Sequence, residues 1–362
     1  MDAPDVTDLD GRPRRDEEHA EPVTVDAGPG RGAESPARRP RRRLTVSQAG
    51  LVLAYVVVVG FFWSQRPDVF ASWQTWRGIL DASALPAIVA MGLTVTLIAG
   101  DFDLSFGATI GLSMAVTAVL LSTHGWSWPA AALVALACAL AIGVVNGVLV
   151  TWANVNSLIA TLAISSVVTG LDAKVSNQQT ISTGIPESFT DLGTTRWLGL
   201  GVSLWVAIVV GAALYLLVSH TESGRYLFAT GGNREAARLA GVRTRALRTV
   251  GMVACAVTAA IVGVLLCAQT ASYYPNAGGG YLLPAFAAAF LGTALGGGRF
   301  GIAATAFGVL FLQTLQTGLT VLNVQPWAVS VVQGSVLAIA VIVSTSGQIR
   351  LPRLGRRRAV RA

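Results

Sequence analysis

Long apolar runs separated by short polar connections dominate the chain between residues 44 and 346. A membrane-spanning helix needs about 20 apolar residues, or somewhat fewer where neighbouring helices shelter its ends. By this rule the pattern predicts ten spans, near 45–64, 84–99, 106–122, 129–151, 157–172, 198–219, 249–268, 282–296, 300–319 and 327–345. We therefore expect an all-α polytopic membrane protein in which 44–346 form the transmembrane domain and the lipid bilayer is the solvent.

The composition agrees with a lipid-embedded fold, because 53% of the 362 residues are hydrophobic and only 12% are charged. A soluble fold of this length could not cover so much apolar surface. The charges gather in three places: of the 26 basic residues, 21 lie in the first 43 residues, in 220–248, or in the last 16. This distribution is typical of the cytosolic flanks of membrane spans and gives no indication of a nucleic-acid partner.

The orientation follows from the same charges, since basic flanks stay on the cytosolic side of a membrane. The basic run at 37–43 predicts a cytosolic N-terminus, and ten crossings return the C-terminus to the cytosol. The predicted outer loops then carry only four basic residues, Arg66, Arg77, Lys174 and Arg196. Nine or eleven spans would break this asymmetry.

Two tails complete the domain organisation. Residues 1–36 hold ten acids together with Pro and Gly and almost no large apolar residue, so 1–43 is expected to be a disordered cytosolic tail. Residues 347–362 carry six arginines and are expected to form a basic cytosolic tail.

The connection 65–83 is amphipathic, with Phe70, Trp73, Trp76 and Ile79 near helical spacing. An interfacial helix is expected here. It would serve as an anchor or as a gate that lies along the outer surface.

A weak internal repeat joins two spans at an offset of 198 residues. Leu85, Pro86, Ala87, Ala90, Leu93, Leu97, Gly100 and Phe102 match Leu283, Pro284, Ala285, Ala288, Leu291, Leu295, Gly298 and Phe300. Chance is a serious competitor in a chain rich in Ala, Leu and Gly. A true repeat would place Asp101 and Arg299 at equivalent inner ends of two spans, as in many transporters.

No pattern for catalysis or metal binding is present in the sequence. It contains no GxSxG, no HExxH, and no cluster of His, Cys and carboxylates. Its one lysine, Lys174, lies in a predicted outer loop, so neither glycine triplet, 278–280 or 296–298, can form a P-loop. We expect a transporter subunit that is not an enzyme, has no catalytic residue, metal or cofactor, and takes any nucleotide energy from another polypeptide.

Few ionisable groups are available for an ion-coupled mechanism, which buries such groups at mid-membrane. The candidates are Asp101 and Asp103 between the second and third spans, Asp172, and Arg299. Two interpretations of Asp103 stay open. It either caps the helix that begins near Phe106 or lies on a substrate path.

The polar segment 220–248 predicts a short cytosolic helix. Asn233 is a good N-cap, Glu235 lies in the first turn, and Gly241 is a natural C-cap, which gives two turns of about 10 Å. Its small face, Ala236, Ala237 and Ala240, would fit a groove on a partner, while Arg238, Arg243, Arg245 and Arg248 offer pairing to acidic groups or lipid headgroups. A basic loop that only enforces topology explains the arginines but neither the cap nor the alanine face.

Four stretches resemble the permease subunits of ATP-binding-cassette importers of the ribose/xylose/galactoside class. They are 91–113, 146–171, 224–242 and 285–319, and the resemblance covers about 85 to 345. It implies a compact fold of ten helices in the cytoplasmic membrane of a prokaryote, and a pore made with a second permease copy or a paralogue. It also implies cytosolic ATPase subunits, which bind the ATP and Mg, and an extracytoplasmic sugar-binding protein.

The resemblance also assigns residues. The ATPase-coupling element would comprise Gly231, Gly232, Asn233, Glu235, Ala236, Ala237, Arg238 and Gly241. For the translocation pathway, the two carboxylates Asp101 and Asp103 are joined as candidates by amide and hydroxyl side chains that could hydrogen-bond a sugar, namely Ser105, Asn146, Thr161 and Gln313. Two departures stand out: Asp101 and Phe102 occupy positions where the family usually has Gly and Ile, and Pro284 one where an acidic residue is common.

The favoured function is monosaccharide import by alternating access, driven by separate ATPase subunits. The alternative is a stand-alone ion-coupled carrier for a small polar solute, for which Asp101 or Asp103 would be essential. A membrane scaffold without transport is a third hypothesis.

Overall fold

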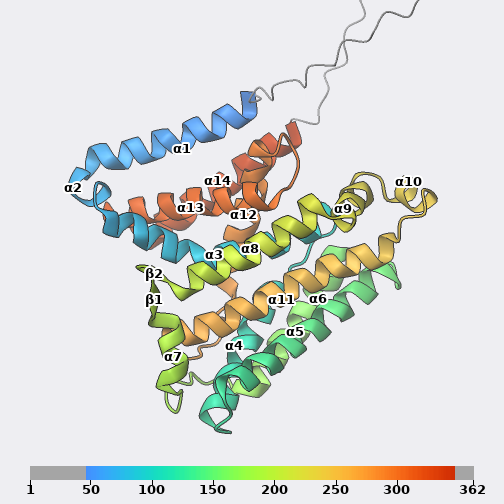
Figure 1. Cartoon of the computed structure of the whole chain (residues 1–362), viewed down its shortest axis with the longest axis horizontal. Helices are drawn as coiled ribbons and strands as arrows, with labels where there is room; N and C mark the ends of the chain where they lie inside the picture. Colours follow the sequence, from blue (N-terminus) through green and yellow to red (C-terminus); the bar gives the residue numbers. More distant parts are fainter. Residues whose placement is uncertain (1–45, 347–362) are drawn as a thin grey trace, which may run out of the picture. The chain divides into compact units, whose positions relative to one another are not determined.

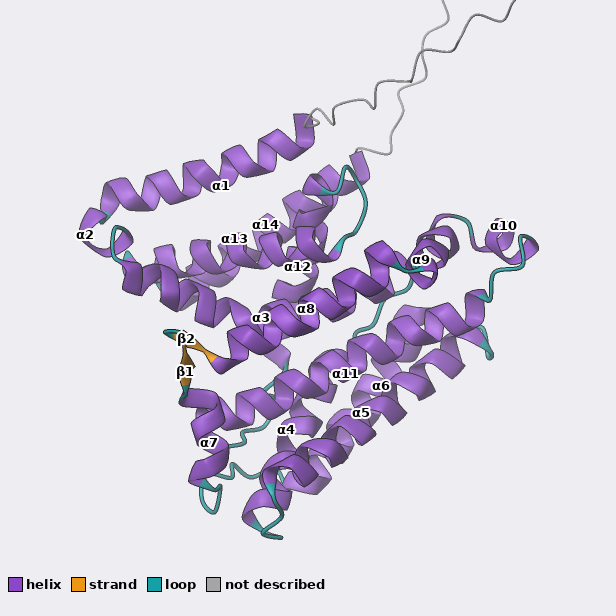
Figure 2. Ribbon diagram, viewed as in Figure 1, coloured by secondary structure: helices purple, strands orange, loops and turns teal. Residues whose placement is uncertain are grey.

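The computed structural model describes residues 46–346, and the two predicted tails lie outside this range. Within it the chain forms α1 (Val46–Gln65), α2 (Pro67–Phe70), α3 (Trp73–Ile98), α4 (Phe106–Ser122), α5 (Trp128–Thr151), α6 (Ser157–Ser176), α7 (Glu187–Thr194), α8 (Val202–His220), α9 (Glu222–Gly232), α10 (Arg234–Leu239), α11 (Thr244–Thr270), α12 (Leu282–Leu295), α13 (Ile302–Val321) and α14 (Pro326–Ser346). A 3-10 turn, η1 (Gly279–Tyr281), precedes α12. Strand β1 (Arg196–Trp197) pairs antiparallel with β2 (Leu200–Gly201) in a small hairpin (Figure 2).

Each predicted span corresponds to one helix. Six helices in the described range, α3, α5, α6, α8, α11 and α13, are long and apolar enough to cross a membrane, and shorter apolar helices lie in α1, α4, α12 and α14. The prediction of an all-α polytopic membrane fold is confirmed. The largest boundary difference is at α3, which begins at Trp73 instead of near residue 84.

The connections alternate between two ends of the helices (Figure 1). The start of α1, the end of α14, and the helices α9 and α10 lie toward one end, which we call the α10 end. The opposite end carries α2, α7 and the β1–β2 hairpin. An even number of crossings between the first and last helices follows from this arrangement.

Close helix packing centres on α11, which contacts α3, α4 and α5. Gly143 on α5 illustrates how small residues permit this approach, because a Cβ there would lie 2.8 Å from the Cα of Val253 on α11. In lipid, where tails are as apolar as the side chains, such packing supplies much of the drive for helix association.

The segment 65–83 does not form the interfacial helix that its pattern predicts. Its first part is the short helix α2, and its second part is the start of the long helix α3. Phe70 and Ile79 are fully buried, and Phe70 stacks on Phe62 of α1 at 5.6 Å between ring centroids. Phe62 and Phe70 therefore help to pack α1 onto α3 and α13. Of the four residues in the predicted amphipathic pattern, Phe70, Trp73, Trp76 and Ile79, only Trp73 is exposed.

Candidate functional site

The helix predicted in 220–248 is present as α10, which Asn233 and Gly241 delimit. The side chain of Asn233 accepts a hydrogen bond from the backbone N–H of Ala236 at 3.0 Å, and Gly241 has a φ of 83°. The preceding helix α9 was not predicted. The signal for it is Thr221, whose hydroxyl accepts from the N–H of Gly224 at 3.2 Å in a second N-cap.

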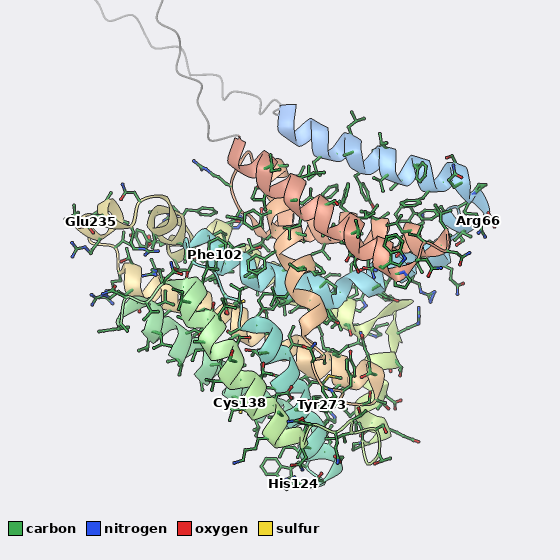
Figure 3. The ribbon with its side chains drawn as sticks, turned by 180° about the vertical axis from the view of Figure 1, so that it is seen from behind. Arg66, Phe102, His124, Cys138, Glu235 and Tyr273 are labelled. Carbon is green, nitrogen blue, oxygen red and sulfur yellow. The ribbon has the colours of Figure 1, made fainter. Side chains whose placement is uncertain are left out.

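The exposed surface of α10 differs from the predicted alanine face. Ala237 is buried against its own chain, while Ala236 and Ala240 are exposed and Leu239 is 77% exposed. Figure 3 shows Glu235 on this projecting part of the α10 end, far from Arg66. The face available to a partner is therefore centred on Leu239, with Ala236 and Ala240 beside it.

The arginines of 220–248 are less free than their sequence suggests. Arg238 donates to Glu235 at 2.6 Å and 3.2 Å, and these hydrogen bonds, with the charge of Arg238, lower the pKa of Glu235. The guanidinium of Arg245 lies 5.4 Å from the ring centroid of Trp152. Arg248 is buried and pairs with an acidic residue of its own chain, so it is not available to lipid headgroups.

Arg248 pairs with Asp101, whose side chain is only 3% exposed. Its Nε lies 2.6 Å from one carboxylate oxygen of Asp101 and its Nη2 lies 2.8 Å from the other, which makes a bidentate ion pair. Arg234, the first residue of α10, approaches the same carboxylate at 3.5 Å. This ion cluster joins three elements: the loop after α3, the start of α10, and the second turn of α11.

The ion cluster lies where α9 and α10 meet the C-terminal end of α3. A Cβ on Gly231 would collide with the carbonyl oxygen of Ile98, the last residue of α3. Gly100, with a φ of 81°, presents its own Cβ position 3.3 Å from the Cα of Gly231. Gly231 and Gly100 therefore allow the backbone of the α9–α10 junction to rest directly on the end of α3.

The segment 101–105, which links α3 to α4, is held by side chains from α5 and α6. The N–H of Leu104 donates to the hydroxyl of Thr161 at 3.1 Å, and the amide of Asn146 donates to the hydroxyl of Ser105 at 2.7 Å. Ser105 in turn donates to Asp103 at 2.7 Å. Five of the six pathway candidates, Asp101, Asp103, Ser105, Asn146 and Thr161, are thus brought together and are buried.

Asp103 does not cap α4 in the way its position predicts. Its carboxylate accepts the N–H and hydroxyl of Ser105, two residues on, in a local turn, and Ser105 rather than Asp103 is the N-cap residue of α4. The second carboxylate oxygen of Asp103 and the amide oxygen of Asn146 have no well-aligned hydrogen-bond donor among the described residues, although the buried thiol of Cys255 interacts with the Asp103 carboxylate. Asp103 and Asn146, which both bond to the hydroxyl of Ser105, therefore each keep one further buried acceptor oxygen.

Gln313, the sixth pathway candidate, makes none of these contacts and is half-buried in the middle of α13. Its neighbour Gln316 accepts a hydrogen bond from Gln333 of α14 at 3.1 Å.

At the opposite end of the protein, Tyr273 donates to Asp172 at 2.9 Å, and both side chains are buried. Within residues 46–346 no group of three His, Cys, Asp or Glu is placed to hold a metal.

A cavity of about 530 Å³ opens beside the ion cluster. Its lining combines both ends of the internal repeat with the α9–α10 junction: Gly100, Asp101, Phe102, Gly298, Arg299, Phe300, Gly231 and Gly232. Gly298, like its counterpart Gly100, adopts a left-handed conformation, with a φ of 85°. The ends of the two repeat segments therefore line a single cavity.

Comparison with known proteins decides the family. The family model for "Branched-chain amino acid transport system / permease component" matches residues 77–341. The chain belongs to this permease family. No solved structure matches it significantly.

Several curated relatives share most of the chain. The ribose import permease protein RbsC of Escherichia coli (strain K12) is 33% identical over 301 residues, 82% of this chain and 93% of RbsC. The L-arabinose transport system permease protein AraH of the same strain is 34% identical over 275 residues, 75% of this chain and 83% of AraH. The autoinducer 2 import system permease protein LsrC of Escherichia coli O157:H7 is 31% identical over 294 residues, 81% of this chain and 84% of LsrC.

The family confirms two predictions made from the sequence. The protein is a membrane permease component of the kind found in ATP-binding-cassette importers, and it is a transporter subunit rather than an enzyme. The matched range contains α4 to α13 and nearly all of α3, so it includes the α9–α10 junction and the segment 101–105.

Proposed function

We propose that this permease imports a monosaccharide across the cytoplasmic membrane of a prokaryote, in a complex with cytosolic ATPase subunits and an extracytoplasmic sugar-binding protein. The observation that carries the proposal is the extent of similarity to RbsC and AraH, whose names describe ribose and L-arabinose transport. LsrC is named for autoinducer 2 import, so the named substrates of these relatives are not all monosaccharides.

The coupling element is proposed to be 231–241, which contains α10. Its support is the exposed Leu239 beside Ala236 and Ala240, a compact face that a groove on an ATPase could accept. The exposed Glu235–Arg238 pair adds a charged edge to that face. Gly231 belongs to the same element because its backbone rests on the end of α3, and Gly232, which lines the neighbouring cavity, links it to Asn233 at the start of α10.

The translocation pathway is proposed to pass the segment 101–105. Asp103 and Asn146 each keep one acceptor oxygen without a well-aligned donor among the described residues, and such acceptors suit the hydroxyl groups of a sugar. Both side chains are fully buried, so they would reach the substrate only after the inner ends of the helices separate. Two permease chains, either two copies or this chain and a paralogue, are proposed to form the pore, with both termini in the cytosol.

The test is to purify the permease from its native membrane and identify the proteins that accompany it. We expect a P-loop ATPase that is lost when Glu235→Ala and Arg238→Ala are combined, while the permease itself stays folded. Proteoliposomes that contain this complex and the binding protein should take up sugar only when ATP is present on the side of the membrane that the ATPase subunits face. Uptake by the permease alone, driven by an ion gradient and abolished by Asp103→Asn, would instead support the ion-coupled carrier.

A further inference from the structure

The three members of the ion cluster are held unequally. Arg248 makes two short contacts to Asp101, and its side chain is only 8% exposed. Arg234 makes one contact of 3.5 Å to the same carboxylate, and its side chain is 46% exposed. The Asp101–Arg248 pair is therefore a fixed part of the fold, whereas Arg234 can leave it at little cost.

Charge makes Arg234 still easier to release. One carboxylate faces two guanidinium groups, so the ion cluster carries an excess positive charge. Burial, and then the charge of Arg248, lower the pKa of Arg234, although Asp101 opposes this effect. The repulsion between the two arginines weakens the contact of Arg234 with Asp101, because Arg234 is the half-exposed member and can turn toward solvent, whereas Arg248 is buried.

Arg234 also stands at a mechanical junction. It follows the N-cap of α10 directly, while Asp101 follows Gly100 at the end of α3. The neighbouring cavity of about 530 Å³ gives the α9–α10 junction room to move. A displacement of α10 therefore acts on Asp101 in two ways, through the contact of Gly231 with the end of α3 and through the charge of Arg234.

We propose that Arg234 is a positioning residue of the transport cycle, whose contact with Asp101 ties α10 to the inner end of α3. The buried Asp101–Arg248 pair is the anchor, and Arg234 is the member that tightens or releases as α10 moves. This inference rests on the proposed function, because it assumes that ATPase subunits displace α10.

The test uses the complete importer in proteoliposomes, with D-ribose as the probe, and measures ribose uptake and ATP hydrolysis together. Arg234→Gln should lower the number of ribose molecules transported per ATP by up to about fivefold, the factor that a half-exposed ion pair can supply. Arg234→Lys keeps the charge and should retain the ratio. Arg225→Gln is the matched control: Arg225 lies on α9, 69% exposed, and pairs only with Glu222 among the described residues.

A second measurement does not depend on the sugar. In a background without native cysteines, Phe102→Cys reports on the inner end of α3, because Phe102 lines the cavity. ATP with vanadate should change its rate of maleimide labelling, and Arg234→Gln should remove most of that change. The labelling therefore tests the tie even if D-ribose is not transported.

Three results would overturn the inference. One is an Arg234→Gln variant that transports as many ribose molecules per ATP as the unaltered importer and shows the same nucleotide-dependent change in labelling at Phe102→Cys. Another is an equal loss in Arg234→Gln and Arg234→Lys. The third is a parallel fall of uptake and ATP hydrolysis with the amount of assembled complex, which would make Arg234 merely structural. If the unaltered importer shows no ATP-dependent uptake but keeps a nucleotide-dependent change in labelling that Arg234→Gln removes, the result counts against D-ribose as substrate and supports the tie.

Discussion

Removing the charge of Asp101 is the sharpest perturbation that the structure offers. Asp101→Asn would leave Arg248, only 8% exposed, without its counter-ion, and Arg234 with no carboxylate to approach. Breaking a buried ion pair by removing one partner costs about 3–5 kcal/mol, because an uncompensated charge stays out of water. The expected loss in the free energy of unfolding is therefore about 3–5 kcal/mol.

The assay is reversible unfolding of the purified permease in mixed micelles, followed by circular dichroism at increasing denaturant. Glu222→Gln is the control, because Glu222 and Arg225 are exposed and 3.5 Å apart, and such surface pairs contribute little. Asp101→Ala combined with Arg248→Met should recover most of the loss, since apolar replacements of a buried ion pair are often near neutral. A single substitution no more harmful than the control, or a double one no better than the single, would refute the reasoning.

Three further predictions concern other contacts. Gly231→Ala should lower the free energy of unfolding by about 1–3 kcal/mol, because the added methyl group collides with the carbonyl oxygen of Ile98. Gly232→Ala is the control, because its methyl group would meet no neighbour among the described residues. Equal thermal unfolding of the two variants would contradict this reasoning. Tyr273→Phe should cost about 1–3 kcal/mol in the same assay, because it leaves the buried Asp172 without its hydroxyl donor, and no shift relative to the exposed Tyr215→Phe would argue against it. An impermeant maleimide should label Leu198→Cys in intact cells and Leu239→Cys only in inverted vesicles, and the reverse pattern would invert the proposed orientation.

The fold could be predicted from the sequence because lipid leaves few choices. A spanning backbone must satisfy its own hydrogen bonds, so each apolar run becomes a helix, and the number of runs sets the number of crossings. The cap at Asn233 and the left-handed Gly241 are equally local, and both were predicted. Local chemistry was misleading where tertiary packing decides, as for Phe70 and Ile79, whose aromatic and apolar pattern suggested an interface but which are buried.

The candidate site was only partly predictable. Sequence patterns picked out Asp101, Asp103 and Arg248 separately, but the ion pair joins Asp101 to a residue 147 positions away, a distance that no local rule spans. Likewise, Ala237 belongs to a small face by spacing, and only the contact of α10 with its own chain shows that it points inward. The internal repeat gains physical content from the structure, since Gly100 and Gly298 share a left-handed conformation and line one cavity.

The central claim is that α10 receives mechanical work from a separate ATPase. The most direct test is a photo-crosslinking amino acid at position 239, where the native leucine is 77% exposed, activated in native membranes. The account predicts one major adduct, with an ATPase that carries a P-loop, and its loss when Glu235→Ala and Arg238→Ala are combined. An adduct only with lipid, or with a protein on the extracytoplasmic side of the membrane, would contradict it.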